Sequence, residues 1–241
     1  MTADQPEHLS YHLADRVATI TMDDGKANAM NPRMLAAINA ALDRSQADAA
    51  GAVVLAGRPG MFSGGFDLSV FKTSPADTLL MLEAGARLSD RLLRFPLPLV
   101  AACTGHAIAM GLFTLMCCDM RVGVTEGARF QANEVLIGLT LPGFAAEVCR
   151  QRLLPSHYQL ATLTARPYNP AQALAVGMLD LGVPADQVLA TAQQTAAQML
   201  SLNAAAFAAS KLVVRQASLT ALGMAIATDV SGWQARFGQL A

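Results

Sequence analysis

Apolar stretches that alternate with helical stretches constrain the fold of this chain more than any other sequence feature. The run AGAVVLAG (50–57) is short and apolar, and a helical segment follows it at about residues 77–95. The prolines of FPLPLVAACTG end that helix before a third buried strand, and HAIAMGLFTLMCCDMRVGV then predicts a turn, a buried helix and a strand. Strands that return through helices lie parallel in one sheet, so the pattern predicts an α/β fold.

The two ends of the chain add a hairpin and a helical region to this pattern. LSYHLADRVATITMD has two short alternating runs hinged at ADR (14–16), which is typical of a β-hairpin or meander. A helix is expected from Asn31, a good N-cap, with Pro32 at its first position. From about residue 143 onward nearly everything is expected to be helical, including three Ala-rich helices after Pro184, and the helices after Asn203 could contact other subunits.

Composition excludes several classes of protein. The 241 residues carry a formal net charge of −1 with Lys and Arg scattered, so we expect no nucleic-acid partner. Hydrophobic residues make up 53% and charged residues 15%, which predicts a homo-oligomer that hides part of this surface. No stretch approaches the roughly 20 apolar residues of a membrane span, and MTADQPEHLS is unlike a signal peptide. We therefore expect a cytoplasmic protein without a membrane partner.

The cysteines and histidines predict no metal centre. The four cysteines lie inside apolar segments without CxxC spacing, which is typical of buried, reduced thiols: Cys103, Cys117, Cys118 and Cys149. The four histidines are dispersed, so structural or surface roles are expected for them: His8, His12, His106 and His157.

Three loops rich in small residues, each after a predicted strand, are the candidate functional segments: DGKANAMN, FSGGFD and GHAIAMG. The second belongs to RPGMFSGGF, which is predicted as a glycine-rich loop and matches neither a P-loop nor a dinucleotide-binding motif. Small residues let the main chain approach a ligand, and N–H groups near a helix start can hold a developing oxyanion. Tight turns are the alternative, but three such loops followed by a lone acid, Glu134, favour a functional site.

On these segments the chain resembles the crotonase superfamily of enoyl-CoA hydratases and isomerases over nearly its whole length. KANAMN is similar to the family's first CoA-contact segment, and FSGGFDL to its first oxyanion segment. TGHAIAMGLFTLMCCDMRV resembles the strand, loop and helix that supply the second oxyanion donor, and NPAQALAVGMLDLGVP resembles a later segment.

The resemblance implies a crotonase-like spiral of ββα turns with a C-terminal helical trimerisation region. Residues 1–185 would form the core with the active site, and residues 186–241 would pack on the core and on neighbouring subunits. A homotrimer or a dimer of trimers is implied, with an acyl-CoA thioester as substrate and no separate cofactor.

The resemblance also implies an oxyanion hole made by two main-chain amides. By position these amides belong to Phe66 and Met110. Glycine is common at the second position, so Met110 is a departure that leaves Gly111 as an alternative donor. Further substrate-binding positions are Lys26, Ala27, Asn28, Ala29, Gly64, Gly65, Asp67, Leu68, Gly111, Phe113 and Pro142.

Glu134 matches the second of the two carboxylates that hydratases use, whereas Phe113 stands at the position of the first. Because ANEVLIGLTLPGF is most similar to the mitochondrial-type Δ3,Δ2-enoyl-CoA isomerases, the resemblance implies that one glutamate moves the proton. A hydratase or another crotonase-type reaction and an inactive acyl-CoA-binding or assembly subunit remain alternatives. Glu134 could instead cap nearby backbone donors, and structural roles are expected for Asp67 and Asp119.

The phosphates of CoA require cations. Lys26, beside the first contact segment, is the first candidate, followed by Arg58 and Lys72. Lys211 or Arg236 of a neighbouring subunit is a further candidate, and a solvated surface charge is the alternative for each of them.

Overall fold

The computed structural model describes residues 8–238, and its larger sheet confirms the predicted α/β fold. The sheet has six strands in the order β1-β2-β3-β5-β7-β9, of which only the β1–β2 pair is antiparallel. The predicted hairpin is present, and its turn residues Asp15 and Arg16 have φ of 49° and 64°. The strands are β1 Leu9–Ala14, β2 Val17–Met22, β3 Ala52–Ala56, β5 Leu99–Cys103, β7 Met120–Val124 and β9 Leu181–Val183.

A second, three-stranded parallel sheet was not predicted. It contains β4 Gly60–Ser63, β6 Gly105–Ile108 and β8 Phe130–Gln131, in the order β4-β6-β8. The sequence pattern assigned β4 to a glycine-rich loop and β6 to a turn, and both assignments were wrong. A Cβ on Gly105 would lie 1.9 Å from the carbonyl carbon of Gly60. The glycines therefore permit close packing of these short strands, which hides them from a pattern search.

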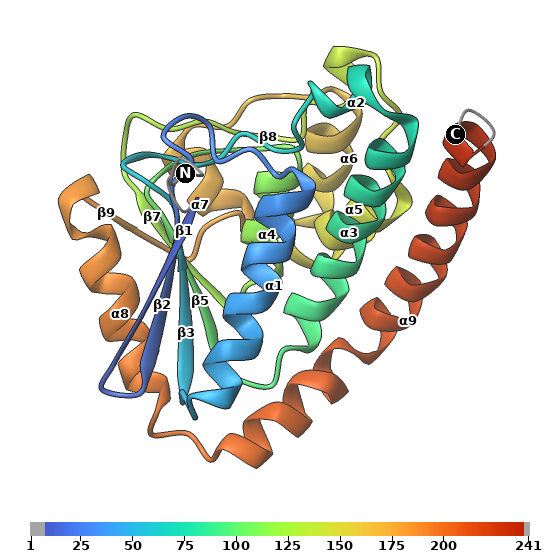
Figure 1. Ribbon diagram of the computed structural model, residues 1–241. Helices are drawn as coiled ribbons and strands as arrows, with labels where there is room; N and C mark the ends of the chain where they lie inside the picture. The colour runs from blue at the N-terminus through green and yellow to red at the C-terminus, as the bar shows by residue number, and fades with distance from the viewer. Residues whose placement is uncertain (1–7, 239–241) are drawn as a thin grey trace, which may run out of the picture.

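Helices cover both faces of the larger sheet. Helix α1 begins where expected, because the side chain of Asn31 accepts a hydrogen bond from the Met34 amide at 2.9 Å. Figure 1 shows α1 and α3 side by side, with α8 on the other side of the strands. The α-helices are α1 Pro32–Ala47, α2 Val70–Thr73, α3 Pro75–Arg94, α4 Met110–Cys117, α5 Gly143–Arg152, α6 Pro155–Leu163, α7 Pro170–Val176, α8 Val188–Met199 and α9 Ala204–Phe237.

The core is divided by the sheet into two clusters. In β3, Val53 and Leu55 face the larger cluster, whereas Val54 faces a smaller one that includes Val188 and Ala192 of α8. This alternation is the two-residue period of a strand, with both faces buried as a parallel sheet requires. Full burial of each valine or leucine stabilises the fold by about 1.5–3 kcal/mol.

The C-terminal region differs from its prediction. After Pro184 the described chain forms two α-helices rather than three, because residues 204–237 continue as one helix, α9. Helix α9 packs along α3 and α5 of its own chain (Figure 1). The boundary proposed after residue 185 stays a prediction. Across residues 8–238 no single helix is long and apolar enough to cross a membrane, although the bent pair Ala185–Met199 and Ala204–Phe237 passes that test jointly.

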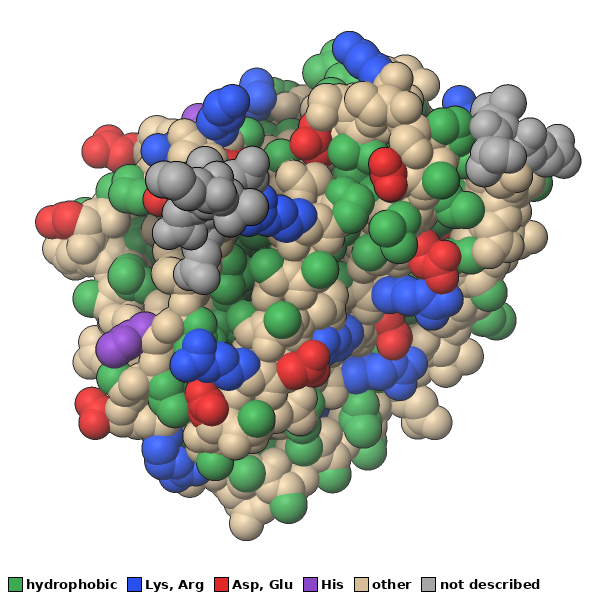
Figure 2. All heavy atoms as spheres, in the orientation of Figure 1, with side chains coloured by type: hydrophobic (Ala, Val, Ile, Leu, Met, Phe, Trp, Pro, Cys, Tyr) green, Lys and Arg blue, Asp and Glu red, His purple; other side chains and the backbone are tan. Residues whose placement is uncertain are grey.

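The predicted state of the cysteines is confirmed: all four are buried and unpaired. Within the described part of the chain no group of three or more His, Cys, Asp or Glu side chains could hold a metal ion. On the face seen in Figure 2, Lys and Arg side chains are dispersed among acidic and uncharged ones and form no continuous stripe.

Candidate active site

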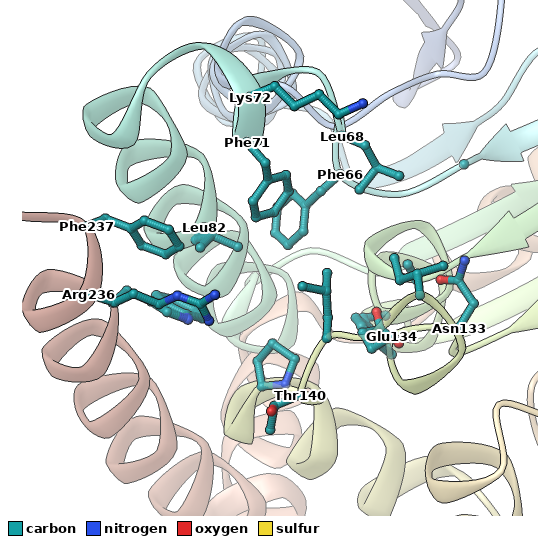
Figure 3. Close-up of a pocket in the computed structure, with 17 residues that line it drawn as sticks. Phe66, Leu68, Phe71, Lys72, Leu82, Asn133, Glu134, Thr140, Arg236 and Phe237 are labelled. Atoms are coloured by element: carbon teal, nitrogen blue, oxygen red, sulfur yellow. The ribbon is translucent and has the colours of Figure 1, made fainter. Parts of the chain in front are cut away.

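The smaller sheet brings three segments of the chain together. Its strands are parallel, with Ser63 opposite Ala107 after a register shift at residues 61–63 and Ala107 opposite Phe130, so their carboxyl ends meet at one edge. At that edge β4 leads to Phe66, β6 leads to Met110 and β8 leads to Glu134. A cavity of about 500 Å³ opens beside them (Figure 3), lined by Gly64, Phe66, Leu68, Phe71, Lys72, Leu82, Ala109, Phe113, Asn133, Glu134, Ile137, Leu139, Thr140, Pro142, Trp233, Arg236 and Phe237.

The loops after β4 and β6 are in direct contact. Gly65 has φ of 94°, and a Cβ on it would lie 2.8 Å from Ala109 Cβ and 3.3 Å from the Met110 nitrogen. Only glycine fits such a position without strain. Among residues 8–238, no acceptor is found for the main-chain N–H of Phe66 or of Met110. The two amides thus lie on neighbouring segments with their hydrogen bonds unused.

The Met110 side chain does not obstruct the cavity. It is fully buried, and its sulfur lies 3.4 Å from the place of a Cβ on Gly85 of α3. Ala109 lines the cavity instead, with φ of 50° and ψ of −126°, a conformation that is costly for any residue with a Cβ. Gly111 packs on β4, because a Cβ there would lie 2.4 Å from the Ser63 carbonyl oxygen.

Glu134 is a buried acid with one carboxylate oxygen unpaired. Only 7% of the residue is exposed, and its Oε2 has no hydrogen-bond partner within the described chain. It precedes the short 3-10 helix Val135–Ile137 and makes no side-chain capping bond, so the alternative of a helix cap is wrong. Burial raises the pKa of Glu134 to about 7, and a hydrogen bond from its own main-chain amide opposes this only in part.

An aromatic side chain lines the same cavity as this acid. Phe113 of α4 is buried, lines the cavity, and packs edge-on against Phe144 at 6.2 Å between ring centroids. Phe144 in turn packs edge-on against Trp233 of α9 at 6.3 Å. Among the cavity-lining residues within 8–238, Glu134 is the only acid. The wall around it can therefore exclude water but supplies no second carboxylate.

The first small-residue loop is held by hydrogen bonds. The carboxylate of Asp24 accepts from the amides of Lys26, Asn28 and Ala29 at 2.7–2.9 Å. The Asn28 side chain is fully buried and donates to the Met22 and Phe62 carbonyls. The Asn28 amide and carbonyl are engaged as well, by Asp24 and the Ser63 hydroxyl, so the residue holds the loop and its contact with substrate stays a prediction.

This loop also lies against the second one. The Ala27 carbonyl accepts from the Gly64 amide at 2.7 Å. The carboxylate of Asp67 accepts from the amide and the hydroxyl of Ser69 just before α2, in agreement with a structural role.

The cations predicted to bind the CoA phosphates differ in where they lie and in whether another group already pairs with them. Arg58 donates to the Lys26 carbonyl and lies 3.0 Å from an Asp23 oxygen, whereas Lys26 itself is exposed. Lys72 and Arg236 both line the cavity, and Arg236 reaches it from α9 of the same chain.

Lys211 does not lie at the cavity surface as a free cation. It is buried, and its Nζ donates to the Phe95 and Leu97 carbonyls and pairs with Asp119 at 2.7 Å. Its charge is therefore neutralised inside its own chain, and the prediction that it holds a CoA phosphate is wrong.

Several lining residues were not found from the sequence. Asn133 is the nearest in sequence to Glu134, and its Oδ1 is buried without a partner. Its position before Glu134 was the one available signal. The apolar wall comes from segments far apart in the chain, namely Phe71, Leu82, Trp233 and Phe237. No motif marks them, because helices α2, α3 and α9 become neighbours of the cavity only on folding.

Comparison with known proteins gives one consistent family. The family model described as enoyl-CoA hydratase/isomerase matches residues 13–239. The structure of an enoyl-CoA hydratase from Mycobacterium marinum is 42% identical, with a TM-score of 0.89 over 96% of this chain and 100% of that one. An enoyl-CoA isomerase structure from Mycobacterium tuberculosis is 43% identical, with a TM-score of 0.89 over 95% and 99%.

A human relative has the same fold at lower identity. The structure of human mitochondrial delta3-delta2-enoyl-CoA isomerase is 26% identical, with a TM-score of 0.89 over 96% of this chain and 92% of that one. Hydratases and isomerases both occur among these similar proteins, so similarity alone does not choose between the two reactions.

Proposed function

This chain belongs to the enoyl-CoA hydratase/isomerase family, and from that premise we propose that it moves the double bond of a 3-enoyl-CoA to the 2-position. The observation that carries the choice of reaction is Glu134, a buried acid whose Oε2 is unpaired and which lines a cavity with no other acid among its described residues. Isomerisation needs one group that removes a proton and returns it. Hydration in the two-carboxylate manner would need an acid where Phe113 stands.

The two free amides would bind the thioester oxygen. The N–H groups of Phe66 and Met110 lie on loops that touch each other, and neither has an acceptor in the described chain. Each preorganised donor of this kind contributes on the order of 3 kcal/mol to stabilising an oxyanion. The Met110 amide is favoured over that of Gly111, because the Met110 nitrogen adjoins the loop of Phe66.

Glu134 would move the proton in two steps. Its carboxylate takes a proton from C2, and the electrons of that C–H bond form a C1–C2 double bond as the thioester oxygen becomes negative. The dienolate then takes the proton back at C4, which restores the C1 carbonyl and leaves the double bond between C2 and C3. A pKa of about 7 suits a group that must both accept and release a proton near neutral pH.

Replacing the acid tests this mechanism. We expect Glu134→Gln to lower the rate of conjugated-thioester formation from 3-hexenoyl-CoA by a factor of about 10³ or more, with CoA-ester binding nearly unchanged. For the wild type, the rate should rise with pH through about 7, because the ionised form is the base. Glu147→Gln, which removes the half-buried partner of the exposed Arg150 on α5, is the matched control. A fully active Glu134→Gln protein would refute the mechanism.

A second substrate separates the alternatives. Loss of conjugated absorbance from 2-hexenoyl-CoA would indicate hydration, and binding of both esters without any change would indicate an inactive acyl-CoA-binding subunit. Rising absorbance with the 3-enoyl ester alone supports the isomerase.

Self-association stays part of the proposal. Helix α9 exposes several apolar side chains, with 72% of Val213, 84% of Val214 and 63% of Met224 accessible. Burial of these side chains against another copy of the chain would agree with the predicted homo-oligomer.

A further inference from the structure

The part of the cavity that α9 forms is apolar except for one cation. Leu82 of α3 and Trp233 and Phe237 of α9 line it together with Arg236. Figure 3 shows Arg236 and Phe237 entering from α9 on the opposite side of the cavity from Glu134, with the Arg236 side chain directed inward.

The loops that hold the thioester set the direction in which a bound acyl chain would run. The amides of Phe66 and Met110 would place the thioester oxygen, and the first CoA-contact loop adjoins them through the hydrogen bond between Gly64 and Ala27. The CoA moiety would therefore leave on the side of that loop. The acyl carbons beyond C4 would pass Glu134 and continue toward the apolar wall and Arg236.

Arg236 has a charge that nothing in the described chain neutralises. It is exposed, its described contact is with the Phe237 ring at 5.3 Å, and no acid among residues 8–238 pairs with it. A methyl-ended acyl chain that reached this point would take water from the guanidinium and offer no counter-charge. A carboxylate would offer two oxygens that match the planar guanidinium.

We propose that the preferred substrate is a 3-enoyl-CoA whose acyl chain ends in a carboxylate, and that Arg236 binds this carboxylate. The inference rests on the proposed function, because it assumes that the reacting carbons lie at Glu134. It makes Arg236 a specificity residue, since the proton transfer itself does not involve the far end of the chain.

Matched pairs of substrates test the inference. The rates of 3-hexenoyl-CoA and 3-hexenedioyl-CoA are compared, as are those of 3-decenoyl-CoA and 3-decenedioyl-CoA, for the wild type, Arg236→Met and Arg236→Lys. At the chain length that reaches the guanidinium, wild-type kcat/KM should favour the carboxylate-ended ester roughly tenfold. Arg236→Met should remove this preference by slowing only that ester, and Arg236→Lys should retain part of it. Arg129→Met, at an exposed arginine outside the cavity lining, should leave the preference intact.

Two outcomes would overturn the inference while leaving the proposed function in place. One is turnover of the methyl-ended esters with no preference for a carboxylate at either length. The other is that Arg236→Met slows both kinds of CoA ester equally but leaves the corresponding pantetheine thioesters, which lack the nucleotide, unaffected. Arg236 would then bind a CoA phosphate. Failure of the wild type to isomerise any ester would instead refute the proposed function itself.

Discussion

Two largely covered carboxylates of this chain have opposite surroundings. Asp119, between α4 and β7, pairs with Lys211 at 2.7 Å and Arg215 at 2.9 Å, and it accepts from the Leu99 amide at 2.8 Å. Glu134 is similarly buried, but its Oε2 has no partner in the described chain and its pKa is raised to about 7. An acid that holds helices together is surrounded by cations, whereas an acid that must exchange a proton is kept away from them.

Helix α4 connects these two regions. Its first residue, Met110, lies at the cavity, and the carbonyl of Cys118 at its other end accepts from Arg152 at 2.7 Å and Arg121 at 2.9 Å. Cations at the carboxyl end agree with the helix dipole, and so would the negative oxygen proposed to bind at the amino end. The paired region therefore orders the helix whose first amide the proposed reaction uses.

Removing the paired acid is expected to have the largest effect on stability. Asp119→Asn leaves Lys211 and Arg215 buried without a counter-charge, which should lower the free energy of unfolding by about 3–5 kcal/mol. Urea titration measures this loss. Asp48→Asn is the matched control, because its pair with Arg44 is exposed and should contribute no more than about 0.5 kcal/mol. Equal losses of unfolding free energy in the two variants would show that Asp119 stabilises the fold no more than an exposed ion pair does.

Removing Glu134 is expected to raise the free energy of unfolding at high pH, whereas removing Asp119 lowers it. The pKa of Glu134 is raised from 4.5 to about 7 in the folded protein, so between these values the folded state keeps a proton that the unfolded state has released. Its contribution to stability therefore falls as pH rises through this window, by on the order of 3 kcal/mol in total.

Glu134→Gln should abolish that decline. Unfolding free energies at about pH 5 and about pH 8 measure it, and the variant should be the more stable protein at the higher pH only. Parallel pH dependence of wild type and variant would show that Glu134 ionises as easily folded as unfolded.

The smallest expected change in stability comes from the strained backbone of Ala109, which lines the cavity. Ala109 has φ of 50° and ψ of −126°, which glycine adopts without strain, so Ala109→Gly should raise the free energy of unfolding by about 1 kcal/mol. The Met110 amide is retained, and isomerase activity should stay within about twofold. Ala76→Gly, in the first turn of α3, should instead destabilise by up to about 1 kcal/mol. A loss of stability in both variants would show that Ala109 is unstrained.

The elements that could be predicted from the sequence are those with strong local signals. The Asn31-Pro32 start of α1, the hairpin at residues 14–16 and the apolar strand β3 each depend on residues close together in the chain. The smaller sheet lacks such a signal, because β8 has only two residues and the glycines of β4 and β6 resemble turns. The sequence predicts three helices after Pro184, whereas residues 204–237 form the single helix α9. Glycines and serines interrupt the apolar pattern of this helix.

The amino-acid sequence by itself determined the family, the α/β class and the identity of the lone acid, since motif residues and their order are local properties of the chain. Only the tertiary structure decided that Glu134 lacks a partner, that Lys211 has one, and that Arg236 reaches the cavity of its own chain. The physical reason is that burial and pairing depend on which distant segments pack together. Three parallel strand ends and one long helix create those contacts, and no local pattern encodes their distances.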